Sequence, residues 1–261
     1  MRYFFRRIIF AVFSGAYFPF KRFFARREIA VLMYHSIADD GWFFSVSPRE
    51  FERQIAYLSK QYHAVTLTHI ADFLEGKKSL LPRSVAVTFD DGYRNFLTDA
   101  LPVLEKYHVP ATLFVCAGTM DAHEVGNTLP VLSSDELRRV AGSGLVTIGS
   151  HAVTHRKLTR LNLDEVRNEV SSSRVLLAGQ TGHAIDFFAY PKGSMNESVR
   201  HMVQAAGYRG AVSTIQRLAE TRGSLYAIPR IQIDARTNFF EFRAKLTVVA
   251  NWYEALWRLF R

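Results

Sequence analysis

The sequence predicts an α/β protein, built as a distorted (β/α) barrel with parallel strands. Short apolar runs alternate with amphipathic helical segments between residues 29 and 233. Runs such as Ala30–Tyr34 (AVLMY) and Val85–Phe89 (VAVTF) are apolar at nearly every position, which is typical of parallel strands buried on both faces. An open doubly wound sheet is the alternative fold, but no glycine-rich phosphate loop follows any of these runs.

The predicted strands are spread along this whole region. In chain order they are Ile29–Tyr34, Ala64–Thr66, Val85–Phe89, Ala111–Val115, Val146–Ser150, Asp186–Tyr190, Gly210–Ser213 and Ile228–Ile233. About seven or eight strand–helix units in succession are expected to close into a barrel.

Start signals mark the helices between the strands. Ser47, Pro48 and Glu50 form a capping box with proline at the first helical position. Ser134 and Asn162 each open a helix with acidic residues in its first turn, where they complement the helix dipole. Strand and helix therefore alternate, as a barrel of βα units requires.

Composition favours one large domain, which we place at residues 28–235. The chain has 261 residues, 48% of them hydrophobic, and barrels commonly reach about 200 to 250 residues as one unit. The net charge is +9, but residues 1–28 hold seven arginines and lysines against Glu28 alone, or 7 − 1 = +6. This concentration argues against a nucleic-acid groove across the fold and for attraction to an anionic surface. The single cysteine, Cys116, allows no intramolecular disulfide.

The N-terminal residues 1–27 are predicted to associate with a membrane. Their apolar part, residues 8–20, is 13 residues long and is broken by Pro19, whereas a membrane-spanning helix needs about 20 residues. A basic, aromatic segment lying in the bilayer interface fits this pattern better. A secretory signal peptide, with Ser14-Gly15-Ala16 as its cleavage region, and a helix packed on the core are the alternatives.

The C-terminal residues 236–261 are predicted to form one or more amphipathic helices. They carry Trp252 and Trp257 and end on Arg261, and tryptophan with arginine is typical of a membrane edge. We therefore expect an anionic membrane surface as a partner and a peripheral position on the inner membrane. A basic N-terminus that is not cleaved favours the cytoplasmic face, and the periplasmic face is the alternative.

Polar residues follow several predicted strands directly. Asp90 and Asp91 come after Val85–Phe89, His151 comes after Val146–Ser150, and His155 lies four residues further on. His35 follows the first strand and Tyr190-Pro191-Lys192-Gly193 follows a later one. In a barrel, the loops after the strands build the active site. The sequence therefore predicts a catalytic site at this end of the barrel.

One aspartate and two histidines are a sound set of ligands for a divalent metal with a fourth position open to water. The spacing of His151 and His155 also occurs on metalloprotease helices, but no glutamate follows His151 and the preceding residues are predicted to be a strand. On its own, this spacing is a weak signal. The Asp-Asp-Gly turn beside it makes the pattern specific.

The segments Thr88–Tyr93 (TFDDGY) and Ser150–His155 (SHAVTH) resemble the first two motifs of the polysaccharide deacetylases, the NodB homology domain. The resemblance covers residues 28–215, and in detail it is most similar to the bacterial poly-N-acetylglucosamine deacetylase branch. It implies a distorted (β/α) barrel. It also implies metal-dependent hydrolysis of an N-acetyl or related acyl group on an amino sugar.

The resemblance also implies roles for individual residues. Asp91, His151 and His155 bind the metal, expected to be Zn²⁺ with Co²⁺, Ni²⁺ or Fe²⁺ as alternatives, and Asp90 stays free as general base. Because the strand has ended at Asp90, the turn at Gly92 releases the two carboxylates from strict alternation. Metal and a backbone N–H, for which Lys192 is the candidate beside Tyr190, would hold the oxyanion of the tetrahedral intermediate.

Two positions depart from the family pattern. The family's arginine that orients the base is replaced by Ala189, and Arg230, at another strand end, is the candidate to take its place. A surface ion pair is the alternative for Arg230. The family's late acid histidine is also missing, because no histidine follows His201. His35 can serve as general acid, since the first and last strands of a closed barrel are neighbours.

Two other classes of function are alternatives to the deacetylase. A glycosidase needs two carboxylates about 5 to 9.5 Å apart, which adjacent aspartates beside histidines do not suggest. A non-catalytic carbohydrate- or lipid-binding module on the same fold is the main alternative to an enzyme. The residues leave open whether the amino sugar is polymeric or lipid-linked and whether the acyl group is acetyl or formyl.

Overall fold

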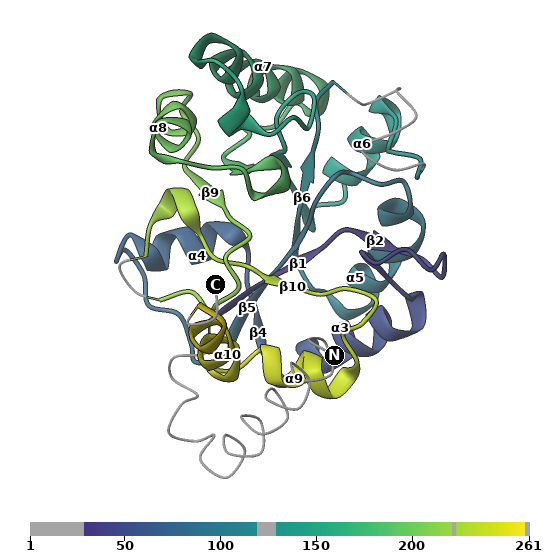
Figure 1. The fold of residues 1–261 in the computed structure, drawn as a ribbon. Helices are drawn as coiled ribbons and strands as arrows, with labels where there is room; N and C mark the ends of the chain where they lie inside the picture. Colours follow the sequence, from purple (N-terminus) through teal and green to yellow (C-terminus); the bar gives the residue numbers. More distant parts are fainter. Residues whose placement is uncertain (1–28, 119–128, 221–222, 259–261) are drawn as a thin grey trace.

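The protein, seen here in a computed structural model that describes residues 29–118, 129–220 and 223–258, is built around one curled sheet of parallel strands (Figure 1). The strand order is β10-β1-β5-β6-β7-β8-β9, with β4 paired to β5, and every pairing is parallel. A parallel bridge between Val212 in β9 and Ile228, just upstream of β10, brings the two ends of the sheet together. The predicted distorted barrel is confirmed.

The sheet strands lie within or beside the predicted runs. They are β1 (Ala30–Tyr34), β4 (His63–Ala64), β5 (Ser84–Phe89), β6 (Ala111–Val115), β7 (Val146–Ser150), β8 (Phe187–Ala189), β9 (Gly210–Val212) and β10 (Ile231–Gln232). A separate two-stranded pair, β2 (Ser36–Ile37) and β3 (Ser45–Val46), follows β1.

Two predicted strands differ most from the observed ones, for identifiable reasons. The run Ala64–Thr66 ends early because Thr66 caps the following helix and accepts a hydrogen bond from the His69 N–H. The run Ile228–Ile233 divides because the Ile228 N–H donates to Ala211 on the β9 side, whereas Ile231 pairs with β1. The last predicted strand therefore closes the barrel by touching both of its edges.

Helices surround the sheet (Figure 1). They are α3 (Pro48–Gln61), α4 (Leu67–Leu74), α5 (Leu101–Tyr107), α6 (Ser134–Ala141), α7 (Leu163–Thr181), α8 (Glu197–Ala205), α9 (Phe239–Lys245) and α10 (Val249–Arg258). Short helical turns occur at η3 (Phe96–Ala100), η4 (Leu158–Arg160), η5 (Pro191–Gly193) and η6 (Leu225–Ala227).

The predicted helix starts hold with two corrections. Ser47 caps α3 through the Glu50 N–H, but the return bond of the predicted capping box is absent, and Glu50 Oε1 is buried without a hydrogen bond. Ser133, not Ser134, caps α6, because its side chain reaches the N–H three residues on. Asn162 caps α7 with a complete reciprocal capping box.

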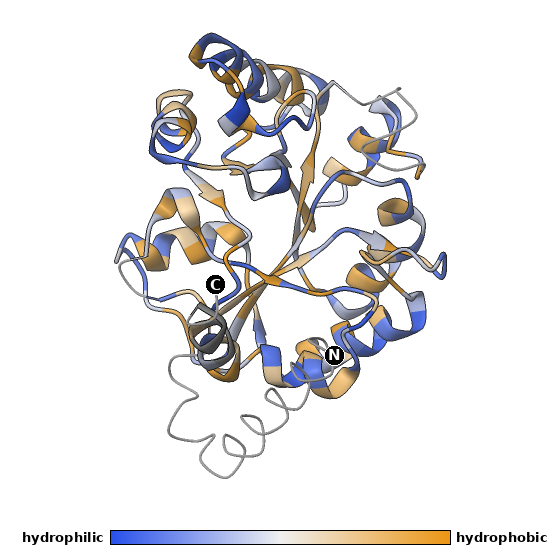
Figure 2. Cartoon of the chain, in the orientation of Figure 1, coloured by the Kyte–Doolittle hydropathy of each residue, from blue (hydrophilic) through white to orange (hydrophobic). Residues whose placement is uncertain are grey.

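The barrel interior is a packed core. One cluster of buried residues runs through it and includes Val31, Ala86, Phe114, Phe187, Ala189, Val212 and Ile228, with the apolar face of α4. Alternate residues of the same strands pack outward under the other helices, which is why whole strands are apolar (Figure 2). A Cβ at Gly149 in β7 would lie 2.5 Å from the Phe114 ring, so the interior has no spare room there. The site must therefore lie at an end of the barrel.

The ends of the chain are described only in part. α9 and α10 lie within the predicted C-terminal region, and half-buried Trp252 packs against the outer core. None of the described helices is both long and apolar enough to cross a membrane. Residues 1–27 and the Trp257 side chain lie outside the described part of the structure, so their predicted contact with a membrane stays a prediction.

Candidate active site

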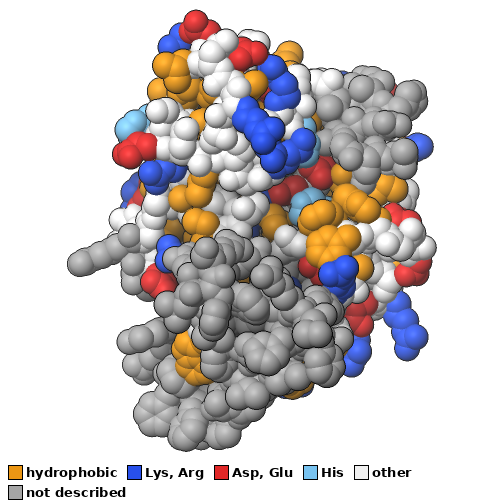
Figure 3. Space-filling model, in the orientation of Figure 1, with side chains coloured by type: hydrophobic (Ala, Val, Ile, Leu, Met, Phe, Trp, Pro, Cys, Tyr) orange, Lys and Arg blue, Asp and Glu red, His pale blue; other side chains and the backbone are white. Residues whose placement is uncertain are grey.

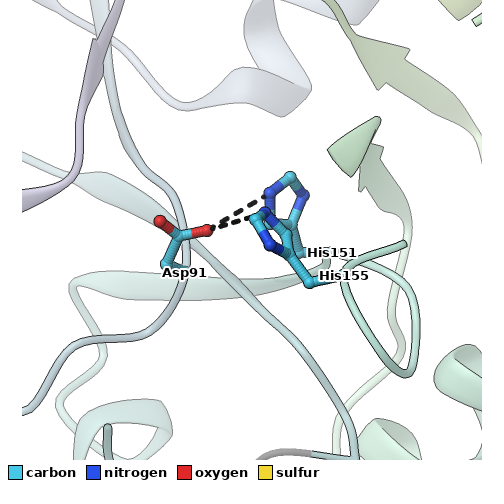
Figure 4. Close-up of side chains that lie close together, drawn as sticks. All are labelled: Asp91, His151 and His155. Atoms are coloured by element: carbon cyan, nitrogen blue, oxygen red, sulfur yellow. Dashed lines mark ion pairs between the residues drawn. The ribbon is translucent and has the colours of Figure 1, made fainter. Parts of the chain in front are cut away.

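The residues predicted to bind a metal converge at the carboxyl ends of the strands. Asp91 Oδ1 lies 3.4 Å from His151 Nε2 and 3.3 Å from His155 Nε2 (Figure 4). Asp91 follows β5 and the histidines follow β7, with β6 between the two strands. Asp91 and His151 are buried, and His155 is half-buried. The parallel sheet thus brings together Asp91 and His151, which are 60 residues apart in the sequence.

A left-handed turn lets two adjacent aspartates serve one site. The Asp90 N–H still donates to the Tyr34 carbonyl, so Asp90 continues the pairing of β5 with β1. Asp91 then takes φ 73° and Gly92 takes φ 75°, which redirects the chain at once. A Cβ at Gly92 would lie 3.1 Å from Val115, so this turn requires glycine for space as well as conformation.

Left-handed backbone is concentrated around these groups. In the described chain, six residues other than glycine have positive φ, and Asp91, Ala152, His155 and Lys192 are four of them. Such conformations cost about 1–3 kcal/mol each and persist only where the surroundings impose them. Two of the side chains predicted to bind a metal, those of Asp91 and His155, are therefore held by imposed backbone geometry.

Glu169, on the buried face of α7, imposes the geometry of the loop between the two histidines. Its carboxylate accepts the N–H groups of Val153 and Thr154 at 2.9 Å each, and it also accepts the Thr154 hydroxyl. Arg156 covers the same carboxylate at 3.2 Å. Burial opposes the charge of Glu169, but the hydrogen bonds from Thr154 and Val153 outweigh it and hold its pKa below the usual 4.5.

Arg230 holds Asp90 through a buried bidentate ion pair. Nη1 lies 2.6 Å from Oδ1 and Nη2 lies 2.7 Å from Oδ2, and the arginine side chain is fully buried. Arg230 also donates to the Ser213 carbonyl and to Thr88 Oγ1. Burial opposes the charge of Asp90, but Arg230 and His151 keep its pKa below the usual 3.8. The alternative of a surface ion pair for Arg230 was wrong, because the side chain lies inside the barrel mouth.

His35 lies after β1, beside the same carboxylates. Burial lowers its pKa, against the opposing charges of Asp91 and Asp90. Its ring packs against Phe44 with centroids 4.8 Å apart, and its Nδ1 makes no hydrogen bond. Asn95 contacts the two residues that follow His35: its Nδ2 donates to Ser36 Oγ at 2.8 Å, and its Oδ1 accepts the Ile37 N–H at 3.5 Å. The structure thus brings His35 to the site from the first strand.

Lys192 and Tyr190 lie on the loop after β8. Lys192 has φ 57°, and no backbone hydrogen bond from its N–H is found in the described chain. The Tyr190 side chain was expected to face the substrate, but it points away from the mouth. It is buried and donates to the Tyr226 carbonyl at 2.9 Å, because the strand direction turns it toward η6. At Tyr190 only the backbone stays near the site.

The geometry fits a divalent metal at Asp91, His151 and His155. A tetrahedral ion with bonds of about 2.0–2.1 Å places its ligand atoms roughly 3.3–3.4 Å apart, which matches the two distances from Asp91 Oδ1. That oxygen is buried and makes no hydrogen bond. His151 Nδ1 lies 2.7 Å from the Ala189 carbonyl, which leaves the Nε2 lone pair facing Asp91. Burial and the neighbouring His151 lower the pKa of His155 to about 4, so it is neutral as a ligand requires.

Two parts of the site were not predicted. Glu169 had a detectable signal: it stands among Val166, Val170, Ser173 and Leu177 at helical spacing, so an acid occupies the buried face of α7. Asn95 and its hydroxyl partner Ser36 had none, because their contact joins the segment after β5 to β2 through side chains far apart in sequence.

Comparisons with known proteins identify the family. Residues 77–211 match the polysaccharide deacetylase family. The poly-beta-1,6-N-acetyl-D-glucosamine N-deacetylase of Staphylococcus aureus (strain MRSA252) is 30% identical over 73% of this chain and 68% of its own length.

Two solved structures share the fold. A polysaccharide deacetylase from Bacillus cereus has a TM-score of 0.73 and 28% identity, covering 84% of this chain and 68% of its own. IcaB from Ammonifex degensii has a TM-score of 0.76 and 23% identity, covering 87% and 97%.

We call the hydrogen bonds that Glu169 accepts from Val153 and Thr154 the Glu169 clamp. Because they involve an ionised carboxylate, the stability that they provide should fall at low pH. Folding lowers the pKa of Glu169 below its usual value of 4.5. The contribution of its charge to the free energy of unfolding is therefore fully present above pH 4.5 and is lost as the pH falls through the lower pKa of the folded protein. Glu169→Gln should lower the melting temperature of the metal-free protein near neutral pH, and the difference from wild type should shrink on acidification. Thermal unfolding measured from pH 7 down to pH 3 tests this. A difference that stays constant over that range would show that the charge of Glu169 contributes nothing.

Proposed function

Because the chain belongs to the polysaccharide deacetylase family, we propose that it is a metal-dependent hydrolase that removes an N-acetyl or related acyl group from an amino sugar. The observation that carries the proposal is the division between the two aspartates. Asp91 faces two histidines with the spacing of metal ligands, whereas Asp90 is directed to Arg230 and is left out of that cluster.

Asp91, His151 and His155 would hold the ion, and Zn²⁺ suits one carboxylate and two imidazoles best. Bound there, the ion would lower the pKa of water and polarise the acyl oxygen. The protein's part is to orient the three ligands. The low pKa of His155 keeps its ring neutral, and the hydrogen bond from His151 to Ala189 and the Glu169 clamp fix the positions of the histidines.

Asp90 would act as general base. Its carboxylate is ionised at neutral pH and is oriented by Arg230, so it can take a proton from water as the new C–O bond forms. The negative charge that develops on the acyl oxygen would be stabilised by the Lys192 N–H, which no backbone acceptor occupies in the described chain. Arg230 supplies from the β10 edge the orienting charge that Ala189 cannot.

His35 would act as general acid. When the C–N bond breaks, the sugar nitrogen needs a proton, and His35 stands at the same mouth, directly after β1. Its Nδ1 has no hydrogen-bond partner in the protein, and its ring packs against Phe44. The products are a free amine on the sugar and acetate, or the corresponding acid.

The substrate would be an amino sugar of a polysaccharide or a glycolipid. The staphylococcal relative is named for a polymer of N-acetylglucosamine. The +6 charge of residues 1–28, together with their aromatic residues, favours a lipid-linked amino sugar at an anionic membrane, with the cytoplasmic face of the inner membrane as the site.

The first prediction separates the roles of the aspartates. Asp90→Asn should retain bound metal while turnover of an N-acetylated glucosamine oligomer falls by about 10²–10⁴-fold, because only the base is lost. Asp91→Asn and His151→Ala should lose both metal and turnover. Metal content by mass spectrometry and amine release measure the two effects, with exposed Asp135→Asn as control. A metal-loaded wild type without hydrolysis would favour a non-catalytic binding module.

The second prediction concerns His35. His35→Ala should lower turnover of the amide by about 10²-fold while metal content is unchanged. An aryl acetate ester should be affected much less, because its leaving group departs without a proton. Exposed His201→Ala is the control. Equal losses on amide and ester would assign His35 a structural role and leave the acid unidentified.

The third prediction concerns the membrane. The full chain should pellet with anionic vesicles and be released in part by salt, since each basic residue near such a surface contributes roughly 1 kcal/mol. Removal of residues 1–27 should weaken pelleting and should reduce activity on a lipid-linked amino sugar more than on a short soluble one. Equal losses on the two substrates would mean that the segment only stabilises the fold.

A further inference from the structure

Cationic side chains gather on the two loops above the predicted metal site. Lys157 and Arg160 lie on the loop between β7 and α7, directly after His155, and Lys192 lies in η5 after β8. All three are exposed. Figure 3 shows blue Lys and Arg side chains beside a hollow in which red Asp or Glu and pale blue His side chains are visible.

The two loops form one rim. The Thr159 N–H donates to Ser194 Oγ at 3.1 Å, and the two hydroxyls lie 2.8 Å apart. Lys192 stands two residues before Ser194 and three after Ala189, whose carbonyl contacts His151 at 2.7 Å. Lys192 therefore stands on the segment that orients His151, and the bond between Thr159 and Ser194 joins to it the loop that carries Lys157 and Arg160.

These cations differ from others near the site in having no acidic partner. Arg156 pairs with Glu165 and Glu169, and Arg94 pairs with Glu136. Across the described residues, no ion pair is found for Lys157, Arg160 or Lys192. Three positive charges without acidic partners give this rim a positive potential, which attracts anions.

The opposite side of the mouth is aromatic. From His35 the rings continue through Phe44 to Trp42 and on to Tyr93, with centroids 4.8, 5.2 and 5.6 Å apart. Trp42 and Phe44 are half-buried, so part of each ring faces solvent. An aromatic face suits the apolar face of a sugar ring. The mouth thus offers an aromatic wall and a cationic wall on either side of the reacting groups.

We propose that the cationic rim binds a phosphate group carried by the amino-sugar substrate. The proposal deepens the function proposed above and rests on it. Phosphate is the anion that best matches the set, because arginine can bind two of its oxygens at once and each lysine adds a point charge. Carboxylated sugars carry the competing anion and are included in the test.

The test compares binding of N-acetylglucosamine 1-phosphate with binding of N-acetylglucosamine to the metal-loaded full chain, by calorimetry. The rim variant is Lys157→Ala/Arg160→Ala. The matched control is Lys77→Ala/Lys78→Ala, which removes the same charge just before the start of β5, at the opposite end of the sheet from the mouth. Wild type and control should bind the sugar phosphate about tenfold or more tightly than the neutral sugar. The rim variant should lose most of that preference and bind the neutral sugar as before.

Three results would overturn the inference. Equal affinity of wild type for the two sugars would show that the rim does not recognise phosphate, and a preference retained in the rim variant would place the phosphate on the metal instead. N-acetylmuramic acid binding as tightly as the sugar phosphate would make the site one for carboxylates. The proposed function fails separately: a phosphate preference lost only in the rim variant, with no amine released from any acetylated sugar, would keep the phosphate site and refute the hydrolase.

Discussion

The buried ion pair between Arg230 and Asp90 is the interaction on which the mouth of this barrel depends. Arg230 stands just before β10 and Asp90 just after β5, and β1 lies between these strands. The guanidinium also reaches Ser213 after β9 and Thr88 in β5, so one side chain joins the strands where the sheet closes. Breaking such a pair leaves an uncompensated buried charge and typically costs about 3–5 kcal/mol. The same contact that closes the fold sets the orientation of the proposed base.

A rigid interior supports the unfavourable backbone of the site. Phe114, Phe187 and their neighbours fill the barrel, so the strand ends have little freedom to move. The left-handed residues Asp91 and His155 lie on loops that start from that frame, and Glu169 satisfies the loop N–H groups between the histidines. Burial of apolar surface in the barrel thus offsets the local backbone strain at Asp91 and His155.

Different loops around the mouth supply the aromatic wall and the cationic rim that would contact the proposed substrate. The aromatic wall comes from the loop between β2 and β3 and from Tyr93, whereas the cationic rim comes from the loops after β7 and β8. Because these loops are not part of the sheet, their exposed side chains can differ without disturbing the buried ion pair. In the proposed enzyme, the loop after β7 would carry both predicted metal ligands and side chains that contact the substrate.

The sequence by itself determined the barrel, the strand ends and the residues with which the site is built. Continuous apolar runs mark buried parallel strands, and Asp90, Asp91, His151 and His35 each follow such a run, so local pattern was enough to place them at one end of the sheet. Only the tertiary structure decided which groups meet. Arg230 reaches Asp90 across 140 positions, Glu169 reaches a loop from another element, and Tyr190 turns to Tyr226 instead of the mouth. The reason is physical: periodicity tells which face of an element is buried, but a side-chain contact depends on how distant elements are packed together.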